Sequence, residues 1–371
     1  MIKSKFFPAL AVLVGTTIGA GFLGIPYVVS KSGFLPGLAY LIFVAVFMMF
    51  IKFYLGEIAL RTRGNHQLTG YAEMYLGKAG KWIMFFAMIF GIYSALVAYL
   101  IAEGESLSYI VFGNLDNSIY FSIGFWIVMS LLSYIGMRAL KKYERIGMVL
   151  VTIIVLAVFI YFFPGIKMEN LSYINTGNLF MPFGVILFSF LAFSAMPEVR
   201  RVLSGQEKLM KKVAFYGVMI PLAVYFLFML VIVGNFGVNV PEIATLVLGR
   251  GFSVLAVVTM FTAFFTLTIA IRDMFRFDFN LGRFRGWMLA CLCPLVLFLL
   301  LNFFKVVGFI EILSIGGVIS GGMTGILILL MNKKAKIHGN RKPEYSMPIS
   351  WKVIGLMSLV FILAVLAQFV L

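Results

Sequence analysis

The sequence predicts an all-α integral membrane protein in which two of the spanning helices are broken. Hydrophobic residues make up 62% of the 371 residues and charged residues only 12%. Apolar runs long enough to cross a bilayer recur along the whole chain, and two of them contain glycines or a proline at their centre. A water-soluble protein of this length cannot bury so large an apolar fraction, so the class is integral membrane.

About eleven spans are expected if each crossing takes roughly 20 apolar residues. They cover residues 7–30, 34–60, 81–104, 119–137, 146–164, 180–203, 212–235, 249–272, 286–304, 307–331 and 351–371. The first run lacks a small-residue cleavage site and is followed by many further spans, so we interpret it as a retained span rather than a signal peptide. The whole chain, 1–371, is therefore expected to form one membrane domain.

The distribution of basic residues predicts the orientation. With the N-terminus in the cytoplasm, 26 of the 30 Lys and Arg residues fall on the inner side, and only Lys31, Lys167, Arg250 and Lys305 fall outside. This asymmetry favours a cytoplasmic N-terminus and an external C-terminus in a plasma or inner membrane. The net charge of +16 is then explained by contacts with anionic lipid headgroups, and no nucleic-acid partner is expected.

The first break is predicted in the stretch from Gly15 to Pro26. This stretch also holds Gly19, Gly21 and Gly24. An interior glycine costs a helix about 1 kcal/mol relative to alanine, and a proline costs about 3 kcal/mol. Non-helical backbone survives at membrane depth only where it lines a cavity or is buried in protein. The stretch is therefore a candidate binding site.

Span six carries the second predicted break, because Pro197 follows a short apolar segment and suits the first turn of a restarting helix. An ordinary proline kink is the alternative. The two interrupted spans are five apart and so run in opposite directions. This arrangement predicts an inverted five-plus-five repeat, with residues 7–164 and 180–331 as the repeats and 351–371 as an extra helix.

Several motifs resemble a known transporter family. Residues 15–27 (GTTIGAGFLGIPY) resemble the first span of permeases in the amino acid–polyamine–organocation superfamily, especially the amino acid/auxin permease and hydroxy/aromatic amino acid permease branches. Residues 56–61 (GEIALR), residues 98–108 (AYLIAEGESLS) and residues 266–268 (TLT) are similar to its spans two, three and eight. The resemblance implies a leucine-transporter-like fold and amino-acid uptake coupled to sodium or protons.

The break in span one is the expected site for the substrate carboxylate. Free N–H groups at Gly19, Ala20 and Gly21 would lie at the positive end of the outer half-helix, which favours an anion. We include the adjoining Thr17 in this substrate site. The alternative is that the glycines form a small-residue packing face.

The break in span six is the expected site for the substrate ammonium, through carbonyls near Phe188, Ser189 and Phe190. For the carboxylate, the resemblance implies an additional tyrosine hydroxyl from span three. We assign this role to Tyr93, near the middle of that span, in preference to Tyr99, which lies further out.

The coupling ion remains open between sodium and a proton. Sodium would use the carbonyls of Gly15 and Ile18 with hydroxyls of Thr262, Thr266 or Thr268; spacing favours the pair Thr262 and Thr266, whereas the family motif favours Thr266 and Thr268. A proton needs a titratable group, and the acidic residues all lie near the ends of spans. We expect sodium, with proton coupling as the alternative, and no other cofactor.

A gate at the cytoplasmic side is expected from charged residues at the ends of spans. Arg272 and Asp273 end span eight and are expected to pair with Glu57 or Glu198. The alternative is that these are solvated interface charges.

These observations predict a symporter of neutral amino acids. An amino-acid sensor on the same scaffold and a metal-ion transporter are the alternatives, although span one carries no acidic ligand for a metal. An enzyme is disfavoured because no nucleophile–base pair or metal cluster lies at membrane depth. No obligatory protein partner is evident, and the sequence leaves the particular amino acid open.

Overall fold

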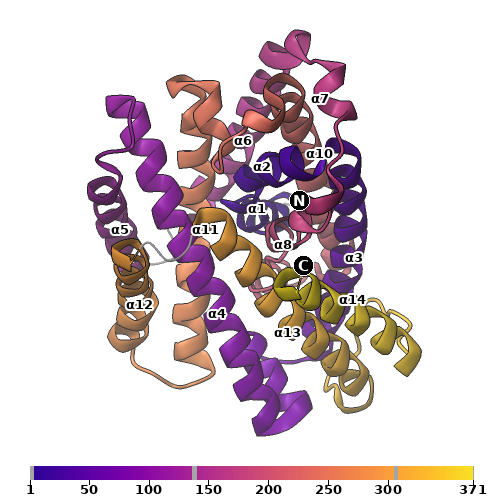
Figure 1. Ribbon diagram of the computed structural model, residues 1–371. Coiled ribbons are helices and arrows are strands. Elements are labelled where there is room, and N and C mark those ends of the chain that lie inside the picture. The colour runs from indigo at the N-terminus through magenta and orange to yellow at the C-terminus, as the bar shows by residue number, and fades with distance from the viewer. Residues whose placement is uncertain (1–3, 136–139, 305–307, 371) are drawn as a thin grey trace.

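The computed structural model describes residues 4–135, 140–304 and 308–370, with side chains left out at 140–148 and 369–370. The predicted ends of span four at 137 and of span eleven at 371, the start of span ten at 307, and Lys305 lie outside these residues. The described residues are predominantly helical, and the whole bundle is shown in Figure 1.

The first span is broken, as predicted. Helix α1 (Phe6–Thr17) and helix α2 (Gly21–Ser32) are separated at Ile18–Ala20 and bent by 49° relative to each other. Span six is also broken, because α8 (Met181–Ser189) and α9 (Ala195–Val202) are separated by residues 190–194. Pro197 lies in the first turn of α9, where its missing N–H has no helical partner to lose.

The remaining helices form the walls around these broken segments. Their bounds are α3 (Phe34–Arg61), α4 (Leu68–Phe112), α5 (Ser118–Ile135), α6 (Leu140–Phe162), α7 (Met168–Ser172), α10 (Met210–Phe236), α11 (Arg250–Phe277), α12 (Arg283–Phe304), α13 (Phe309–His338) and α14 (Trp351–Val370). Short 3₁₀ segments lie at Phe163–Gly165, Thr176–Asn178, Glu207–Leu209, Gly237–Asn239 and Ala244–Leu248.

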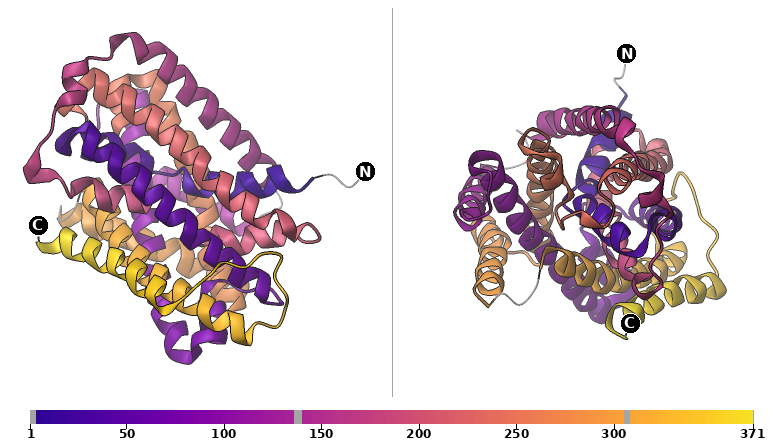
Figure 2. Two further views of the ribbon diagram at one scale, coloured as in Figure 1. Left: turned by 90° about the vertical axis from the view of Figure 1, so that its right-hand side faces the viewer. Right: turned by 45° about the horizontal axis from the view of Figure 1, so that its top comes forward.

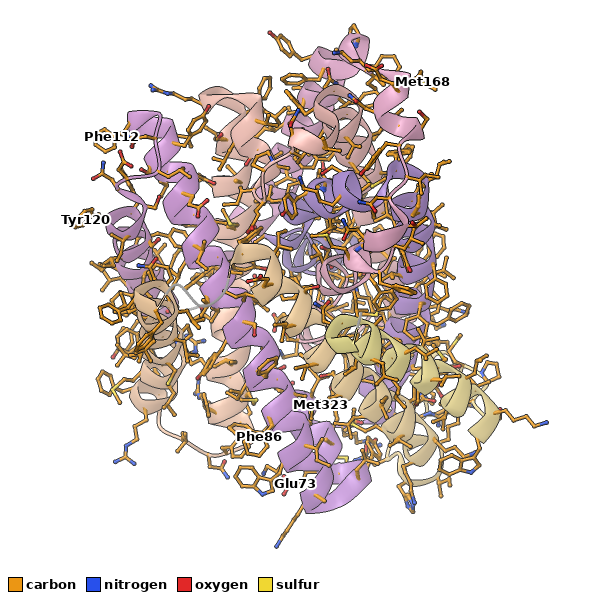
Figure 3. The ribbon with its side chains drawn as sticks, in the orientation of Figure 1. Glu73, Phe86, Phe112, Tyr120, Met168 and Met323 are labelled. Atoms are coloured by element: carbon orange, nitrogen blue, oxygen red, sulfur yellow. The ribbon has the colours of Figure 1, made fainter. Side chains whose placement is uncertain are left out.

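Helix α4 is much longer than predicted for span three. It begins at Leu68 rather than near residue 81, and Gly77 interrupts it with a φ of 75°. This left-handed conformation is one that glycine adopts without the steric cost of a side chain. Figure 3 shows that α4 crosses the whole molecule, with Glu73 near one end and Phe112 near the other. We call these the Glu73 end and the Phe112 end of the molecule.

The broken helices lie inside the bundle and α5, α12 and α14 lie on its outside (Figures 1 and 2). Within the most apolar 18-residue stretch of each helix, 78% of α13 is buried, whereas only 17% of α14 is buried. Helix α14 packs on α13 and α8, while α5 and α12 pack on the opposite flank against α4. The outer helices therefore present apolar side chains to lipid, and the central helices carry the polar backbone of the breaks.

Eight described helices are long and apolar enough to cross a membrane, and the bent pair α1–α2 makes a ninth. The prediction of eleven also counted spans five and six. Helices α8 and α9 have only nine and eight residues, too few for either to span alone. The apolar segment described from α6 and the 3₁₀ turn after it is Val149–Gly165, which is shorter than a full span.

Candidate functional site

The helical hydrogen-bond ladder is interrupted between α1 and α2, at residues 18–20. The N–H of Ile18 still donates to the Val14 carbonyl at 2.8 Å, and the N–H of Gly19 turns back to the Thr17 carbonyl at 3.1 Å. Gly19 is therefore not a free donor, in contrast to the expectation from sequence. The N–H groups of Gly21 and Phe22 have no preceding turn of their own helix to bond, whereas the Leu23 N–H donates to the Ala20 carbonyl at 3.0 Å.

The second break contains a residue in a strained conformation. Ala192 has a φ of 40°, a left-handed conformation that is uncommon for residues other than glycine. The N–H of Phe190 bonds the Leu187 carbonyl at 3.1 Å, and the N–H of Ala195 bonds the Ala192 carbonyl at 3.2 Å. Tight turns thus replace the helical ladder. Strain of this kind clusters at binding sites.

The two breaks touch each other. A Cβ atom placed on Gly21 would lie 2.6 Å from the Ser189 Oγ and 3.0 Å from a ring carbon of Phe188. Only glycine allows so close an approach of the start of α2 to the end of α8. The predicted carboxylate and ammonium segments are therefore neighbours in space, although about 170 residues separate them in the sequence.

Tyr225 of α10 joins the two breaks, and the sequence analysis missed it. Its buried hydroxyl lies 2.8 Å from the Thr17 carbonyl and 2.9 Å from the Ser189 carbonyl, which end α1 and α8. Its ring packs against Phe22 and Phe190. A lone tyrosine in an apolar span is a weak signal, because the sequence does not show which way it faces.

Replacement of Tyr225 by phenylalanine is expected to destabilise the protein by about 1–3 kcal/mol, the cost of leaving a buried acceptor without its donor. Thermal unfolding in detergent measures this loss. Tyr216→Phe on the same helix is the control, because the Tyr216 side chain is exposed. Equal melting temperatures for the two variants would contradict the bridging role.

A cavity of about 70 Å³ lies where the breaks meet. Its lining includes Thr16, Thr17, Gly21, Tyr99, Phe188, Ser189, Leu191, Ala192, Phe193, Ser320 and Thr324. None of the described side chains that line it is charged. Leu68, the first residue of α4, also lines it, so the cavity extends from the breaks toward the Glu73 end.

Tyr99, not Tyr93, is the α4 tyrosine at this cavity. A Cβ on Gly19 would collide with the Tyr99 hydroxyl, which also lies beside the Ala20 backbone. The Tyr93 hydroxyl donates to the Leu289 carbonyl at 2.9 Å, and its ring lines a separate apolar cavity between α4, α12 and α13. In Figure 3, Phe86 and Met323, which line that second cavity too, lie low on α4 and α13.

The other predicted substrate residues divide into two groups. Phe188, Ser189, Gly21 and Thr17 line the cavity. Phe190 is fully buried behind it and packs against Tyr225.

The predicted sodium ligands differ in burial, and their threonine hydroxyls bond within α11. Gly15 and Thr266 are half-buried, and a Cβ on Gly15 would meet no atom within 4 Å. The Thr266 hydroxyl donates to the Thr262 carbonyl at 2.9 Å, and the Thr268 hydroxyl donates to the Phe264 carbonyl at 2.8 Å. Both hydroxyls therefore bond back to carbonyls of their own helix.

Ile18 and Thr262, the other two predicted ligands, are both buried. The Thr262 hydroxyl donates to the Thr259 carbonyl at 3.1 Å, again within its own helix. Helix α1, which carries Gly15 and ends just before Ile18, packs against α11, which carries the three threonines.

Glu57 pairs with a different part of the chain than expected. Its carboxylate lies 2.8 Å from Arg61 Nε and 3.1 Å from Lys336 Nζ, and it accepts the Met347 N–H at 2.8 Å. Asn332 and Ser346 complete its partners. Among the described residues, this carboxylate therefore ties α3 to α13 and to the segment before α14, and has no ion pair with Arg272.

Glu198 and Asp273 are linked through Arg201, which the sequence analysis did not single out. Arg201 forms ion pairs with both carboxylates, at 3.4 Å for Asp273, and Arg272 Nη2 lies 3.3 Å from Asp273. Arg272 also donates to the Ser133 carbonyl at 2.7 Å. The charges thus join α9 to α11 at the Glu73 end, with Arg201 between Glu198 and Asp273 in place of the expected direct pair of Glu198 with Arg272.

These features define an integral membrane transporter, with two broken helices around a central uncharged cavity. The tryptophan/tyrosine permease family model matches residues 2–244. The chain belongs to this family.

Three named relatives cover different shares of the chain. Tyrosine-specific transport system 1 of Haemophilus influenzae is 25% identical over 91% of this chain and 90% of its own length. Glutamine transporter 2 of Aliivibrio fischeri is 25% identical over 63% of this chain, a match that spans only 62% of that relative. The tryptophan-specific transport protein of Shigella flexneri is 23% identical over 61% of this chain and 56% of its own length.

The fold is similar to that of MhsT, solved in complex with L-phenylalanine. The TM-score is 0.67 at 17% identity, over 99% of both chains. This likeness confirms the predicted leucine-transporter-like fold. The relatives and the fold are those of transporters, not of enzymes.

Proposed function

We propose that the chain is a secondary active symporter of neutral amino acids. The observation that carries this proposal is the uncharged cavity at the point where the two helix breaks touch. The first turn of α2 supplies N–H groups for a carboxylate, and the break after α8 supplies carbonyls for an ammonium. A charged side chain on the substrate would have no counter-ion in the described lining.

Aromatic amino acids are the substrates to test first, because the family and one full-length relative carry tyrosine or tryptophan in their names. Glutamine follows from the relative in Aliivibrio fischeri. The cavity of about 70 Å³ is smaller than the 150 Å³ cavity that accepts benzene in an engineered protein. Binding of an aromatic side chain therefore requires Phe188, Leu191 or Phe193 to move.

The proposed architecture keeps the two repeats at 7–164 and 180–331, with 351–371 appended. The N-terminus is placed in the cytoplasm and the C-terminus outside. Support for this orientation comes from the basic residues Arg61, Arg201 and Lys336, which take part in the ion pairs of the Glu73 end. Within the superfamily, the motifs of span one favour the amino acid/auxin and hydroxy/aromatic amino acid permease branches.

Sodium is the driving ion proposed first, held by the carbonyls of Gly15 and Ile18 and by Thr266. The partial exposure of Gly15 and Thr266 and the open space beside Gly15 support this assignment. A proton is the second candidate, because the described residues include a fully buried carboxyl without a hydrogen-bond partner, Glu103.

The decisive experiment is uptake of radiolabelled tyrosine, tryptophan, phenylalanine and glutamine into proteoliposomes. Sodium and pH gradients are imposed separately, and lysine and glutamate serve as charged controls. We expect accumulation of at least one neutral amino acid above equilibrium with one of the gradients. Facilitated equilibration without accumulation, or preferential uptake of a charged amino acid, would contradict the proposal.

Replacement of Tyr99 by phenylalanine is expected to weaken amino-acid affinity about 10- to 100-fold, since a hydrogen bond to a charged group is worth about 1.5–3 kcal/mol. Tyr93→Phe is the matched control on the same helix, because its hydroxyl bonds Leu289 outside the cavity. Binding isotherms on purified protein measure both. A larger loss of amino-acid affinity in Tyr93→Phe than in Tyr99→Phe would show that Tyr93, not Tyr99, contacts the carboxylate.

A further inference from the structure

Glu103 in α4 is a buried acid without a visible partner. The residue is 0% exposed, and neither carboxylate oxygen has a hydrogen-bond partner among the described residues. An ionised carboxylate in such surroundings loses its hydration without compensation, which is costly at membrane depth. Such a group persists where function requires it.

Glu103 lies one helical turn from the candidate substrate site. Residues four apart share a helix face, so Glu103 follows Tyr99, whose hydroxyl touches the Gly19 backbone. The axial rise over four residues is about 6 Å. Ser106 continues the same face, and its buried hydroxyl also lacks a partner among the described residues. Together they form a polar stripe from the first break toward the Phe112 end.

The other charged groups near this part of α4 belong to separate clusters. Glu105 lines a different cavity together with Glu242. Glu311 of α13 caps its own helix at Gly308, and Arg250 of α11 lies against Gly113, the residue that follows α4.

Two neighbouring elements contribute uncharged groups near this part of α4. Helix α5 contributes the Ser122 hydroxyl, which is bonded to the Leu100 carbonyl. The 3₁₀ segment Ala244–Leu248 contributes Thr245, whose buried hydroxyl has no partner among the described residues. Tyr99 is thus the one titratable group identified on the same face as Glu103.

We propose that Glu103 binds a proton that the transported amino acid requires. This inference rests on the proposed function, and it applies whether or not sodium also drives transport. A substrate carboxylate at the first break and an ionised Glu103 would be two like charges in a region of low dielectric. Protonation of Glu103 removes that repulsion, so the amino acid and the proton bind together.

The linkage between proton binding and amino-acid binding predicts a measurable effect on both affinities. If the proton raises amino-acid affinity by some factor, the amino acid raises proton affinity by the same factor. Like charges about 6–10 Å apart at an effective dielectric near 20 give a factor on the order of 10 to 100. Amino-acid affinity should fall by this factor as the pH rises through the titration of Glu103.

The test measures equilibrium binding of a transported neutral amino acid to the purified full-length protein between about pH 5 and about pH 9. Wild type should lose affinity on the order of 10- to 100-fold with rising pH. Glu103→Gln, which mimics the protonated acid, should retain the low-pH affinity at every pH. In proteoliposomes, this variant should keep amino-acid exchange and lose accumulation driven by a pH gradient.

Two control variants remove other titratable groups that could account for the pH dependence of binding. Glu105→Gln removes the neighbouring acid, and Lys52→Met removes another fully buried side chain whose charged group has no partner among the described residues. Both should keep the pH dependence of wild type. Loss of the dependence in Lys52→Met with its persistence in Glu103→Gln would overturn the proposal.

A wild-type measurement keeps the proposal falsifiable if Glu103→Gln does not fold. Amino-acid binding in weak buffer with a pH indicator should take up protons from solution, in an amount that varies with pH. Binding without proton uptake at every pH tested would overturn the role of Glu103 and leave the proposed function intact. Failure of every neutral amino acid to bind would overturn both.

Discussion

Replacement of Gly21 by valine is expected to abolish amino-acid uptake. The new side chain would occupy the space of Ser189 and Phe188, because even a Cβ would lie 2.6 Å from the Ser189 Oγ. Overpacking of a well-packed site costs about 1–3 kcal/mol. The displaced groups line the cavity, so the loss falls on binding, where about 3 kcal/mol corresponds to more than about 100-fold in affinity. Radiolabelled uptake and binding measure the effect.

Gly124→Val on α5 is the matched control. A Cβ at Gly124 would meet no atom within 4 Å, and the residue faces outward. This variant should insert, elute as wild type on size exclusion and transport normally. If Gly21→Val also elutes as wild type and keeps full uptake, the first turn of α2 does not bind the carboxylate.

Replacement of Glu57 by alanine is expected to destabilise the protein by about 3–5 kcal/mol, the cost of breaking a buried ion pair from one side. The side chain of Glu57 is 0% exposed and is paired with Arg61 and Lys336. Removal of the carboxylate leaves both cations without their counter-charge and the Met347 N–H without its acceptor. The melting temperature in detergent should fall strongly, with little change in amino-acid affinity at low temperature.

Glu73→Ala is the comparison for this prediction. Glu73 pairs with Lys81 on the surface, and its side chain is 45% exposed, so its loss should cost less than about 1 kcal/mol. A similar small effect for Glu57→Ala would show that the network around Glu57 is solvated and mobile.

The broken helices could be predicted from sequence because their signal is local. Glycines and a proline inside apolar runs oppose a continuous helix wherever the run is placed. The same local reasoning placed the restart of the second break at Pro197, which lies in the first turn of α9. The local pattern did not predict that the Gly19 N–H donates a hydrogen bond to the Thr17 carbonyl.

The choice between Tyr93 and Tyr99 needed the rotation of α4 about its axis. Residues six apart on a helix differ by about 240° in direction, so at most one of the two can face the site. Polar residues lie on more than one side of this part of α4, with Ser94 next to Tyr93 and Glu103 one turn after Tyr99, so the pattern does not show which side points inward. The structure turns Tyr99 toward the break and Tyr93 toward α12.

The sequence pattern does not predict which residues form hydrogen bonds or ion pairs across long sequence separations. Glu57 meets Lys336 and Met347 across about 280 residues, and Tyr225 meets the Thr17 carbonyl across 208. Arg201 was one of many basic residues at the Glu73 end, so its position between Glu198 and Asp273 emerged only from packing.

The Tyr225 hydroxyl has one proton for two acceptors, the Thr17 and Ser189 carbonyls. The hydroxyl thus links the backbone of the first break to the backbone of the second break. A rearrangement that moves one break away from Tyr225 leaves that carbonyl without this donor, and a buried acceptor left unpaired costs about 1–3 kcal/mol. This cost favours movements in which α1, α8 and α10 keep their contacts and shift together.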